Sequence, residues 1–278
     1  MSYFEGQRAM SDGVKIFARH WTPAVQPKAK LLLLHGAVEH SGRYSHVAEK
    51  LEEAGYEVLA FDLRGYGKTE GRKGHLRHAL VYQDIDELLA EELKDDTPIF
   101  MMGHSLGGQV ALLYCIDRRP PLAGVVVTCP GLEIPEKDRK PAPLLKVLGL
   151  VFPTVSATLP IDDTKLISNS ATLEEFRADP LVHFRGTFGM ARDWYIGLDR
   201  AVGEAGQFPV PLLLVHAKAD EIALCSGSEK FAAHHPGDCE LKIYDSAHHD
   251  LKWEPVWETA FEDIKTWLDD HLSNTNIH

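Results

Sequence analysis

The sequence predicts an α/β fold in which a mostly parallel central sheet is flanked by helices and carries an inserted cap. Three observations lead to this prediction. Several short apolar runs lack alternation, which is typical of strands buried on both faces of a parallel sheet. Segments with helical spacing follow most of these runs, so strands and helices alternate along the chain. The rhythm breaks between about residues 134 and 191, which indicates an insertion.

An opening hairpin is the first element that we expect. Residues 4–10 and 14–21 flank Asp12-Gly13, a pair that favours a hairpin turn. The elements that follow are, in chain order, strand 30–34, helix 44–54, strand 57–61, helix 80–93 and strand 98–102. Gly55 directly follows the first of these helices, where glycine is a common C-cap.

The same alternation continues to the end of the chain, on both sides of the insertion. In chain order we expect helix 106–116, strand 122–128, strand 212–216, helix 229–234, strand 241–244 and a last helix from near Pro255. Proline is favoured in the first turn of a helix. Apolar residues then recur every three or four positions from Trp257 to Leu268, which gives this helix one apolar face.

The insertion is rich in proline and has no clear buried strand. Its prolines are Pro135, Pro141, Pro143, Pro153 and Pro160. Ligands bind at the C-terminal edge of open α/β sheets, and we expect the insertion to lie over that edge. The prediction is therefore a single domain, residues 1–278, with residues 135–190 as a cap over the active site.

Composition and charge narrow the classes of function. The chain has 278 residues, 44% hydrophobic and 25% charged, which is ordinary for a globular protein with one sizeable core. Its formal net charge of -12 repels phosphate backbones, so we expect no nucleic-acid partner. The four cysteines show neither a CxxC pair nor metal-ligand spacing, and we expect reduced thiols and no bound metal. They are Cys115, Cys129, Cys225 and Cys239.

Neither a signal peptide nor a membrane span is visible in the sequence. Residues 1–21 lack a basic stretch followed by an apolar one. No apolar run approaches the roughly 18 residues needed to cross a bilayer. The apolar stretch 144–152 is too short and contains Lys146. We therefore expect a cytoplasmic protein, soluble or loosely associated with a membrane.

The most specific motif in the chain is a nucleophile turn. Residues 103–107, Gly-His-Ser-Leu-Gly, match G-x-S-x-G between an expected strand and an expected helix. The two glycines lack the Cβ atoms that would clash in so sharp a turn. The turn lifts the Ser105 hydroxyl above the sheet at a helix N-terminus, where developing negative charge is stabilised. This context predicts a serine nucleophile, and it excludes dehalogenase and epoxide hydrolase chemistry, which needs an acidic residue at this position.

A serine nucleophile needs a base that takes its proton and a carboxylate that orients the base. In this fold the acid and then the histidine follow the serine along the chain. Asp220 follows the next-to-last expected strand, and Asp245 and Asp62 are alternative acids that also follow strands. After the last strand the sequence offers His248 and His249, and neither composition nor spacing separates these two.

Two backbone N–H groups should stabilise the oxyanion of the tetrahedral intermediate. One belongs to Leu106, the residue after the nucleophile. The other is expected in the loop after strand 30–34, where Gly36 permits a tight turn and the N–H of Ala37 is the candidate. His35 is expected to be buried and to stabilise this turn.

At these residues the sequence resembles the monoacylglycerol lipase family, within the wider group of lysophospholipase-like α/β-hydrolases. The matching stretch HGAVEHSGRY, residues 35–44, is unusually long for a general hydrolase pattern. Further similar stretches are DLRGYG at 62–67, PID at 160–162, DPLV at 179–182 and LKIY at 241–244. The resemblance covers nearly the whole chain and includes the insertion.

The resemblance implies an α/β-hydrolase with a mobile apolar cap, which releases a fatty acid from monoacylglycerols through an acyl-enzyme. It implies neither a metal nor an organic cofactor. It maps the nucleophile to Ser105 and the acid to Asp220. The family's histidine follows a Gly-Ala-x pattern, which residues 246–248 occupy here, so the resemblance selects His249 as the base. A lysophospholipase or a broad-specificity esterase is the alternative, and a ligand-binding receptor on a hydrolase fold is the rival from another class.

The polar end of the site departs from the family. Val38 stands where relatives often have Gly, and Lys252 where some relatives carry a histidine. Glu39 and Arg43 are candidates for contacts to the glycerol-like end of a small lipid ester. The alternative interpretation of these two residues is a local ion pair.

The apolar stretch 144–152 is the candidate for lipid contact. A cap helix with few polar residues suits the uptake of lipid and transient membrane association, and Leu145 and Leu148 are the residues that we select for this role. The alternative is that these leucines pack the cap on the core.

Overall fold

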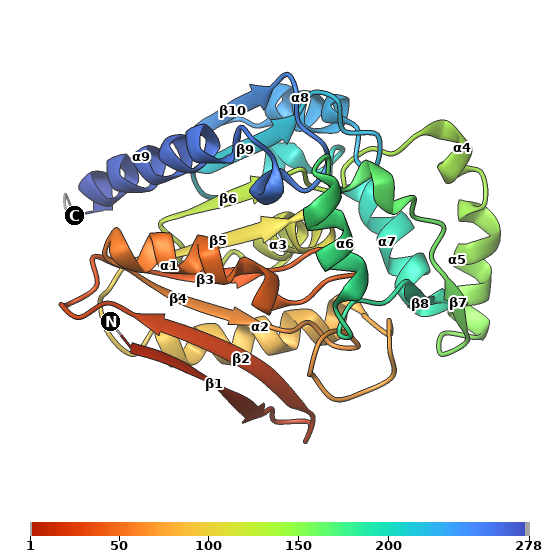
Figure 1. The fold of residues 1–278 in the computed structure, drawn as a ribbon, viewed down its shortest axis with the longest axis horizontal. Coiled ribbons are helices and arrows are strands. Elements are labelled where there is room, and N and C mark those ends of the chain that lie inside the picture. The colour runs from red at the N-terminus through yellow and green to blue at the C-terminus, as the bar shows by residue number, and fades with distance from the viewer. Residues whose placement is uncertain (1, 276–278) are drawn as a thin grey trace.

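The computed structural model describes residues 2–275 and has an eight-stranded sheet at its centre (Figure 1). The strands lie in the order β1-β2-β4-β3-β5-β6-β9-β10. β1 (Ser2–Ala9) and β2 (Lys15–Thr22) form an antiparallel hairpin at one edge, and β2 is also antiparallel to β4 (Tyr56–Phe61). Every neighbouring pair from β4 onward is parallel. The sheet is therefore mostly parallel, as the sequence predicts.

The central strands are buried along their whole length. In chain order the remaining strands of the sheet are β3 (Ala29–Leu34), β5 (Ile99–His104), β6 (Gly124–Thr128), β9 (Leu212–Ala217) and β10 (Cys239–Tyr244). Every residue of β3, β5, β6 and β9 is buried, because helices cover both faces of the sheet. This burial explains the continuous apolar runs. β10 is the other edge strand and is mostly half-buried.

Helices form a layer on each face of the sheet (Figure 1). α1 (Ser45–Glu53) and α9 (Trp257–Thr275) contribute to one apolar cluster. α2 (His78–Glu92), α3 (Ser105–Arg118) and α8 (Cys225–His234) contribute to the other. Three short 3-10 helices lie in the connections between these elements: η1 (Ser41–Tyr44), η3 (Ala205–Gln207) and η4 (Leu251–Trp253). No helix among residues 2–275 is both long and apolar enough to cross a membrane.

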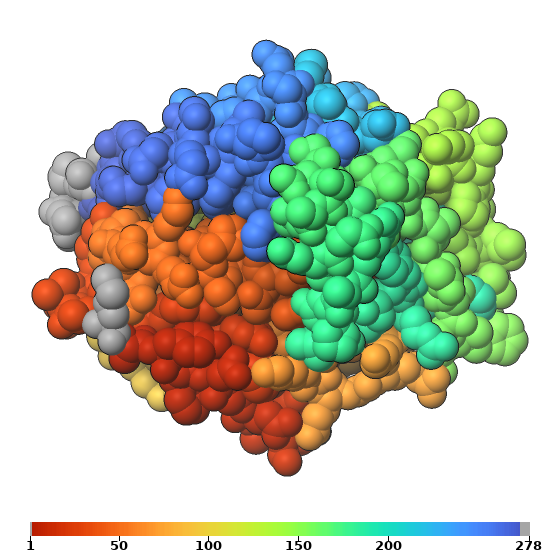
Figure 2. Space-filling model, viewed as in Figure 1, coloured from red at the N-terminus to blue at the C-terminus, as the bar shows by residue number. Residues whose placement is uncertain are grey.

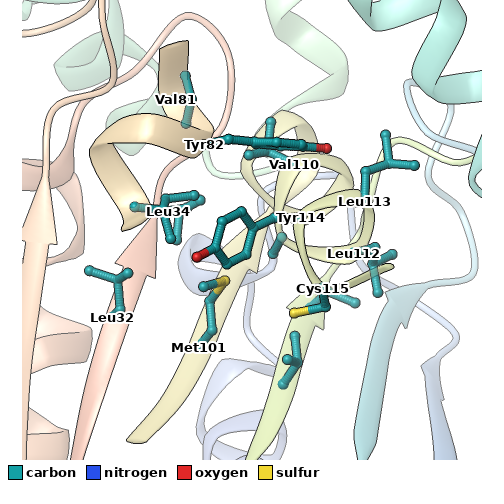
Figure 3. Packing of buried hydrophobic residues seen from close by; sticks show 14 of the residues in the cluster. Leu32, Leu34, Val81, Tyr82, Met101, Val110, Leu112, Leu113, Tyr114 and Cys115 are labelled. Carbon is teal, nitrogen blue, oxygen red and sulfur yellow. The ribbon is translucent and has the colours of Figure 1, made fainter. Parts of the chain in front are cut away.

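Each buried strand contributes side chains to both clusters. Leu32 and Leu34 of β3 lie in the cluster that contains Tyr114 of α3, as Figure 3 shows. Leu31 and Leu33 of the same strand point to the opposite face and belong to the other cluster. Successive side chains of a strand alternate between faces, so β3 joins the two layers into one core.

Residues 135–190, the inserted segment, lie beyond the C-terminal ends of the parallel strands (Figure 1). In the space-filling view their green atoms form one side of the molecule (Figure 2). The elements of this part of the chain are α4 (Glu136–Arg139), α5 (Ala142–Val151), β7 (Ser156–Thr158), η2 (Asp163–Lys165), α6 (Ser170–Ala178), β8 (Arg185–Thr187) and α7 (Phe188–Arg200), which begins inside the segment and runs past its end. β7 and β8 pair with each other, not with the central sheet. α5 packs along α7. A third apolar cluster, which includes Val38 and Phe176, joins the segment to the loop after β3.

Candidate active site

Ser105 lies in the sharp turn between β5, which ends at His104, and α3. Its φ of 50° is in the left-handed region that non-glycine residues rarely adopt. A Cβ on Gly103 would lie 2.6 Å from the carbonyl oxygen of Gly107, and a Cβ on Gly107 would lie 2.4 Å from that of Leu34. Only glycine therefore fits on either side of the serine without moving α3 away from the sheet.

The structure brings Ser105, His249 and Asp220 together at the C-terminal edge of the sheet. His249 Nε2 lies 2.8 Å from Ser105 Oγ, and His249 Nδ1 lies 2.6 Å from Asp220 Oδ2. An imidazole that donates from Nδ1 to the carboxylate leaves Nε2 free to accept the serine proton. Asp220 Oδ1 accepts hydrogen bonds from the N–H groups of Ile222 and Ala223, at 2.8 and 3.0 Å, which fix the carboxylate.

Ser105, His249 and Asp220 form a hydrogen-bonded relay, in which the charges of His249 and Asp220 stabilise each other. Burial alone would lower the pKa of His249, but the Asp220 carboxylate, with Asp250 and Glu39 further away, outweighs burial and raises it. Burial alone would raise the pKa of Asp220, but the positive charge of His249 and hydrogen bonds from His216 and His249 hold that pKa well below the usual range. Asp220 therefore stays ionised and can stabilise the imidazolium that forms when His249 takes a proton.

The alternative acids and the alternative histidine lie elsewhere. Asp62 joins β2 to η1: its Oδ1 accepts hydrogen bonds from Arg19 Nη1 and from Ser41. Asp245 is exposed. His248 is half-buried, and its Nδ1 has no hydrogen-bond partner among the described residues. None of these three groups takes part in the hydrogen bonds that join Ser105, His249 and Asp220.

Both candidate oxyanion donors lie beside Ser105. The N–H of Leu106 is in the first turn of α3, where backbone N–H groups have no acceptor within the helix. Ala37 lines the same cavity as Ser105. The turn that presents Ala37 is tight: Val38 has a φ of 57°, in the left-handed region, and Glu39 Oε1 accepts the N–H of Gly36 at 2.7 Å.

Glu39 belongs to a buried ion cluster. Its Oε2 lies 3.0 Å from Lys252 Nζ, and Lys252 also pairs with Asp250. Its Oε1 accepts a second hydrogen bond from Tyr44 Oη at 2.6 Å. The pair joins the loop after β3 to the loop that carries His249. Glu39 also lines a small cavity together with Ser105. This side chain therefore forms an ion pair and lies at the site as well.

Arg43 lies apart from Glu39 and contacts the inserted segment. Its guanidinium carbon lies 4.8 Å from the ring centre of Phe176 and 5.2 Å from that of Trp253. Its Nη1 lies 3.8 Å from a carboxylate oxygen of Asp179. The residues that line the two cavities at Ser105 do not include Arg43. The contacts of Arg43 therefore fasten α6 to the core.

An apolar cavity of about 280 Å³ opens beside Ser105, between the core and the inserted segment. Its apolar lining includes Ile134, Leu145, Leu159, Ile161, Met190, Trp194 and Ile222. Leu145 lines this cavity, whereas Leu148 is half-buried and is not among the lining residues. Met190 and Trp194, both on α7, were not expected at the site, because no motif in this part of the sequence marks them.

Comparisons with known proteins agree with this geometry. A family model described as "Serine aminopeptidase, S33" matches residues 25–256. Human monoglyceride lipase is 33% identical over 93% of this chain and 88% of that protein. The chain belongs to the monoacylglycerol lipase family. It is a serine hydrolase with the α/β-hydrolase fold that the resemblance implies.

Solved structures of this family superpose closely on the chain. Monoacylglycerol lipase of Paleococcus ferrophilus has a TM-score of 0.85 at 31% identity, over 92% of this chain and 99% of that one. A soluble variant of monoglyceride lipase from Saccharomyces cerevisiae, in complex with a substrate analog, has a TM-score of 0.87 at 26% identity, over 96% and 94%. The similarity therefore includes the inserted segment as well as the core.

Proposed function

We propose that this chain is a serine carboxylic ester hydrolase that splits monoacylglycerols into a fatty acid and glycerol through an acyl-enzyme. The observation that carries the proposal is the Ser105–His249–Asp220 relay beside an apolar cavity. The names of the human and Paleococcus ferrophilus relatives support the same substrate class. Ser105 is the proposed nucleophile, His249 the base and Asp220 the orienting acid.

Acylation begins with the ester carbonyl above Ser105 and its oxygen between the N–H groups of Ala37 and Leu106. His249 Nε2 takes the hydroxyl proton as Oγ attacks the carbonyl carbon, and the Asp220 carboxylate stabilises the resulting imidazolium. The two N–H groups stabilise the oxyanion, at about 3 to 4 kcal/mol for each donor. Collapse of the intermediate breaks the ester C–O bond, and His249 returns the proton to the departing glycerol oxygen.

Deacylation repeats these steps with water. His249 takes a proton from a water molecule whose oxygen attacks the acyl carbon, and the proton then passes to Ser105 Oγ as the fatty acid leaves. Every proton transfer uses His249, so this sequence needs neither a metal nor an organic cofactor.

The two cavities that Ser105 lines suit the two parts of the substrate. The large cavity is lined mainly by apolar side chains, and burying an acyl chain there gains about 0.8 kcal/mol per methylene. The small cavity, about 30 Å³, is lined in part by Glu39 and Asp250. The carboxylate oxygens at this cavity can accept hydrogen bonds from the hydroxyl groups of a glycerol moiety. An apolar cavity beside a small polar one suits a monoacylglycerol, and a comparison of substrates separates this function from the lysophospholipase and broad esterase alternatives.

Initial rates across a panel of esters test this function. The panel contains long-chain monoacylglycerols, the matching diacylglycerols, lysophosphatidylcholine, a short soluble ester and an aminoacyl nitroanilide. We expect kcat/KM to be highest for the monoacylglycerols. Preference for the lysophospholipid would indicate that the chain is a lysophospholipase. Preference for the short ester would indicate a broad-specificity esterase. Tight binding of an ester without hydrolysis would indicate a ligand-binding receptor.

We further propose that the inserted segment is a cap whose α5 touches lipid surfaces. The side chains of Leu144, Val147, Leu150, Val151 and Phe152 are each more than half exposed. Exposed apolar groups in such density usually mark an interaction site.

The four cysteines are free, which supports the cytoplasm as the compartment of this protein. The net charge of -12 supports the absence of a nucleic-acid partner.

A further inference from the structure

The proposed mechanism does not use a cysteine that lies against the relay. Cys129 directly follows β6, which ends at Thr128. Its Sγ, an oxygen of Asp220 and a ring nitrogen of His249 all lie within 4.8 Å of one another. The exposed fractions of these three residues are 0%, 4% and 3%. The three residues come from separate loops, at positions 129, 220 and 249. Because they are far apart in the sequence, no motif predicts the cluster.

The backbone holds Cys129 firmly in this place. Its φ of 43° lies in the left-handed region, which non-glycine residues rarely adopt. Its N–H donates to the carbonyl oxygen of Val215 at 2.8 Å, which ties the turn to β9. Burial, and then the nearby Asp220 carboxylate, raise the pKa of the thiol well above its ordinary value. The thiol therefore carries its proton when only protein surrounds it.

The donor set is that of a zinc site. Thiolate sulfur, imidazole nitrogen and carboxylate oxygen are the three ligand types that Zn²⁺ accepts, whereas Mg²⁺ and Ca²⁺ take oxygen ligands. Two of the three ligands are anions in the bound state, so a dication would leave the buried site without net charge. Glu39 and Asp250 add negative charge nearby, against the single ammonium of Lys252. Of the three ligand residues, His249 is the one that lines the small cavity beside Ser105.

We propose that Cys129, Asp220 and His249 form an inhibitory site for a soft divalent cation, with Zn²⁺ as the probe. The ion binds His249 at Nδ1, the nitrogen that faces Asp220, and the imidazole then carries its proton on Nε2. An Nε2 that holds a proton cannot take the proton of Ser105, so the base is lost. The Cys129 thiol releases one proton as its sulfur binds the ion. Removal of the ion restores the relay.

Only the inhibition, not the ion site, rests on the proposed function, and the two are tested separately. The site is tested by adding Co²⁺ to the wild-type protein, Cys129→Ser, Cys129→Ala and the matched control Cys239→Ser, whose thiol lies on β10 away from the relay. We expect a thiolate-to-cobalt absorption band in the wild type and in Cys239→Ser, and its loss in both Cys129 variants. A wild-type protein without this band overturns the proposal, whether or not the variants fold.

Inhibition is tested by titrating Zn²⁺ during hydrolysis of a soluble short ester, with each variant compared with its own metal-free rate. We expect chelation to restore the rate, Mg²⁺ to leave it unchanged, and Cys129→Ser to raise the half-inhibiting Zn²⁺ concentration at least tenfold. Equal inhibition of the wild type and both Cys129 variants means that the ion acts elsewhere, and the proposal is then wrong. A protein that binds Co²⁺ through Cys129 but hydrolyses no ester contradicts the proposed function and leaves the ion site standing.

Discussion

At the scale of the residue, the reactivity of Ser105 depends on a strained backbone and one hydrogen bond. The left-handed conformation aims the side chain out of the turn, and the 2.8 Å contact with His249 supplies the base. The strain costs about 1 to 3 kcal/mol, which the packing of α3 against β5 and β6 offsets. The hydroxyl oxygen itself contributes little to this packing. Its removal should therefore abolish the chemistry and spare the fold.

Ser105→Ala should abolish ester hydrolysis and labelling by a fluorophosphonate, because no other hydroxyl lies in the relay. Alanine keeps the Cβ, so the turn and the unfolding temperature should be unchanged. Mass spectrometry of the labelled wild type should place the adduct on Ser105. An adduct on a different serine would refute this assignment.

His249→Ala should lower kcat by several orders of magnitude, as removal of the base does in serine hydrolases. His248→Ala is the matched control, since His248 is adjacent in sequence but takes no part in the relay, and its kcat should change by less than about tenfold. Steady-state kinetics of both variants on one soluble ester check the prediction. A larger loss in His248→Ala would show that the loop has a different register.

The pH dependence of kcat/KM should reflect the environment of His249. The base must be neutral, and nearby carboxylates raise its pKa above 6.5 in spite of burial. Activity should therefore rise with pH and reach half its maximum above pH 6.5. Asp250→Asn removes one of these negative charges and should shift the midpoint to lower pH. Asp245→Asn, which removes an exposed carboxylate from the same loop, should leave it in place.

The motif around Ser105 and the order of residues along the chain predict the relay. They leave two adjacent histidines as candidates for the base. His248 and His249 are adjacent, so only the path of the backbone after β10 decides which one faces Ser105. The resemblance selects His249, and that side chain is the one within hydrogen-bond distance of Ser105 and Asp220. Cys129 could not be found in this way, because its relation to the relay arises from the pairing of β6 with β9.

At the scale of the element, apolar runs predict strands well and helix starts less well. β3 and β9 lie where continuous apolar runs predict them, since burial on both faces leaves little room for polar residues. α8 begins at Cys225, four residues before the expected helix 229–234, because its first turn is small and polar and shows no apolar periodicity. β7 and β8 were not expected; they pair only with each other, and β7 is fully exposed and carries no apolar pattern.

The exposed face of α5 gives the prediction at this scale. Leu145 lines the cavity and Leu148 is half-buried, so acidic changes there would disturb packing as well as lipid contact. Leu144 and Val147 are 62% and 59% exposed and offer the cleaner test. Leu144→Asp with Val147→Asp should weaken binding to neutral vesicles and slow the turnover of long-chain monoacylglycerol. Two such side chains gain roughly 3 to 6 kcal/mol in an apolar phase.

A soluble ester and a control variant separate lipid contact from lid function. Turnover of a short ester by the α5 double variant should stay near that of the wild type. Val25→Asp, at an exposed apolar residue in the loop between β2 and β3, should affect neither assay. If long and short substrates slow equally in a folded protein, α5 is part of a structural lid and does not dock on lipid.

At the scale of the whole molecule, the sheet makes one cooperative unit of the two helical layers. The side chains of each central strand alternate between the two apolar clusters. Loss of one helical layer would therefore expose apolar side chains of the same strands that pack against the other layer. The inserted segment joins this unit through the cluster of Val38 and Phe176 and through the packing of α5 on α7. If the chain is one domain, as the sequence predicts, we expect it to unfold in a single transition.

Trp267→Ala tests this cooperativity far from the active site. Trp267 of α9 is 3% exposed and packs so closely on the sheet that a Cβ on Gly124 would lie 2.6 Å from its ring. Removing a buried ring of this size costs about 3 to 5 kcal/mol, which lowers the melting temperature by roughly 5 to 9 °C in a chain of this length. Phe4→Ala, at a 71% exposed ring on the edge strand β1, should cost less than about 0.5 kcal/mol. Calorimetry should show one transition in both variants, with activity and structure lost together; a second transition at an unchanged temperature would mean that the inserted segment folds as a separate unit.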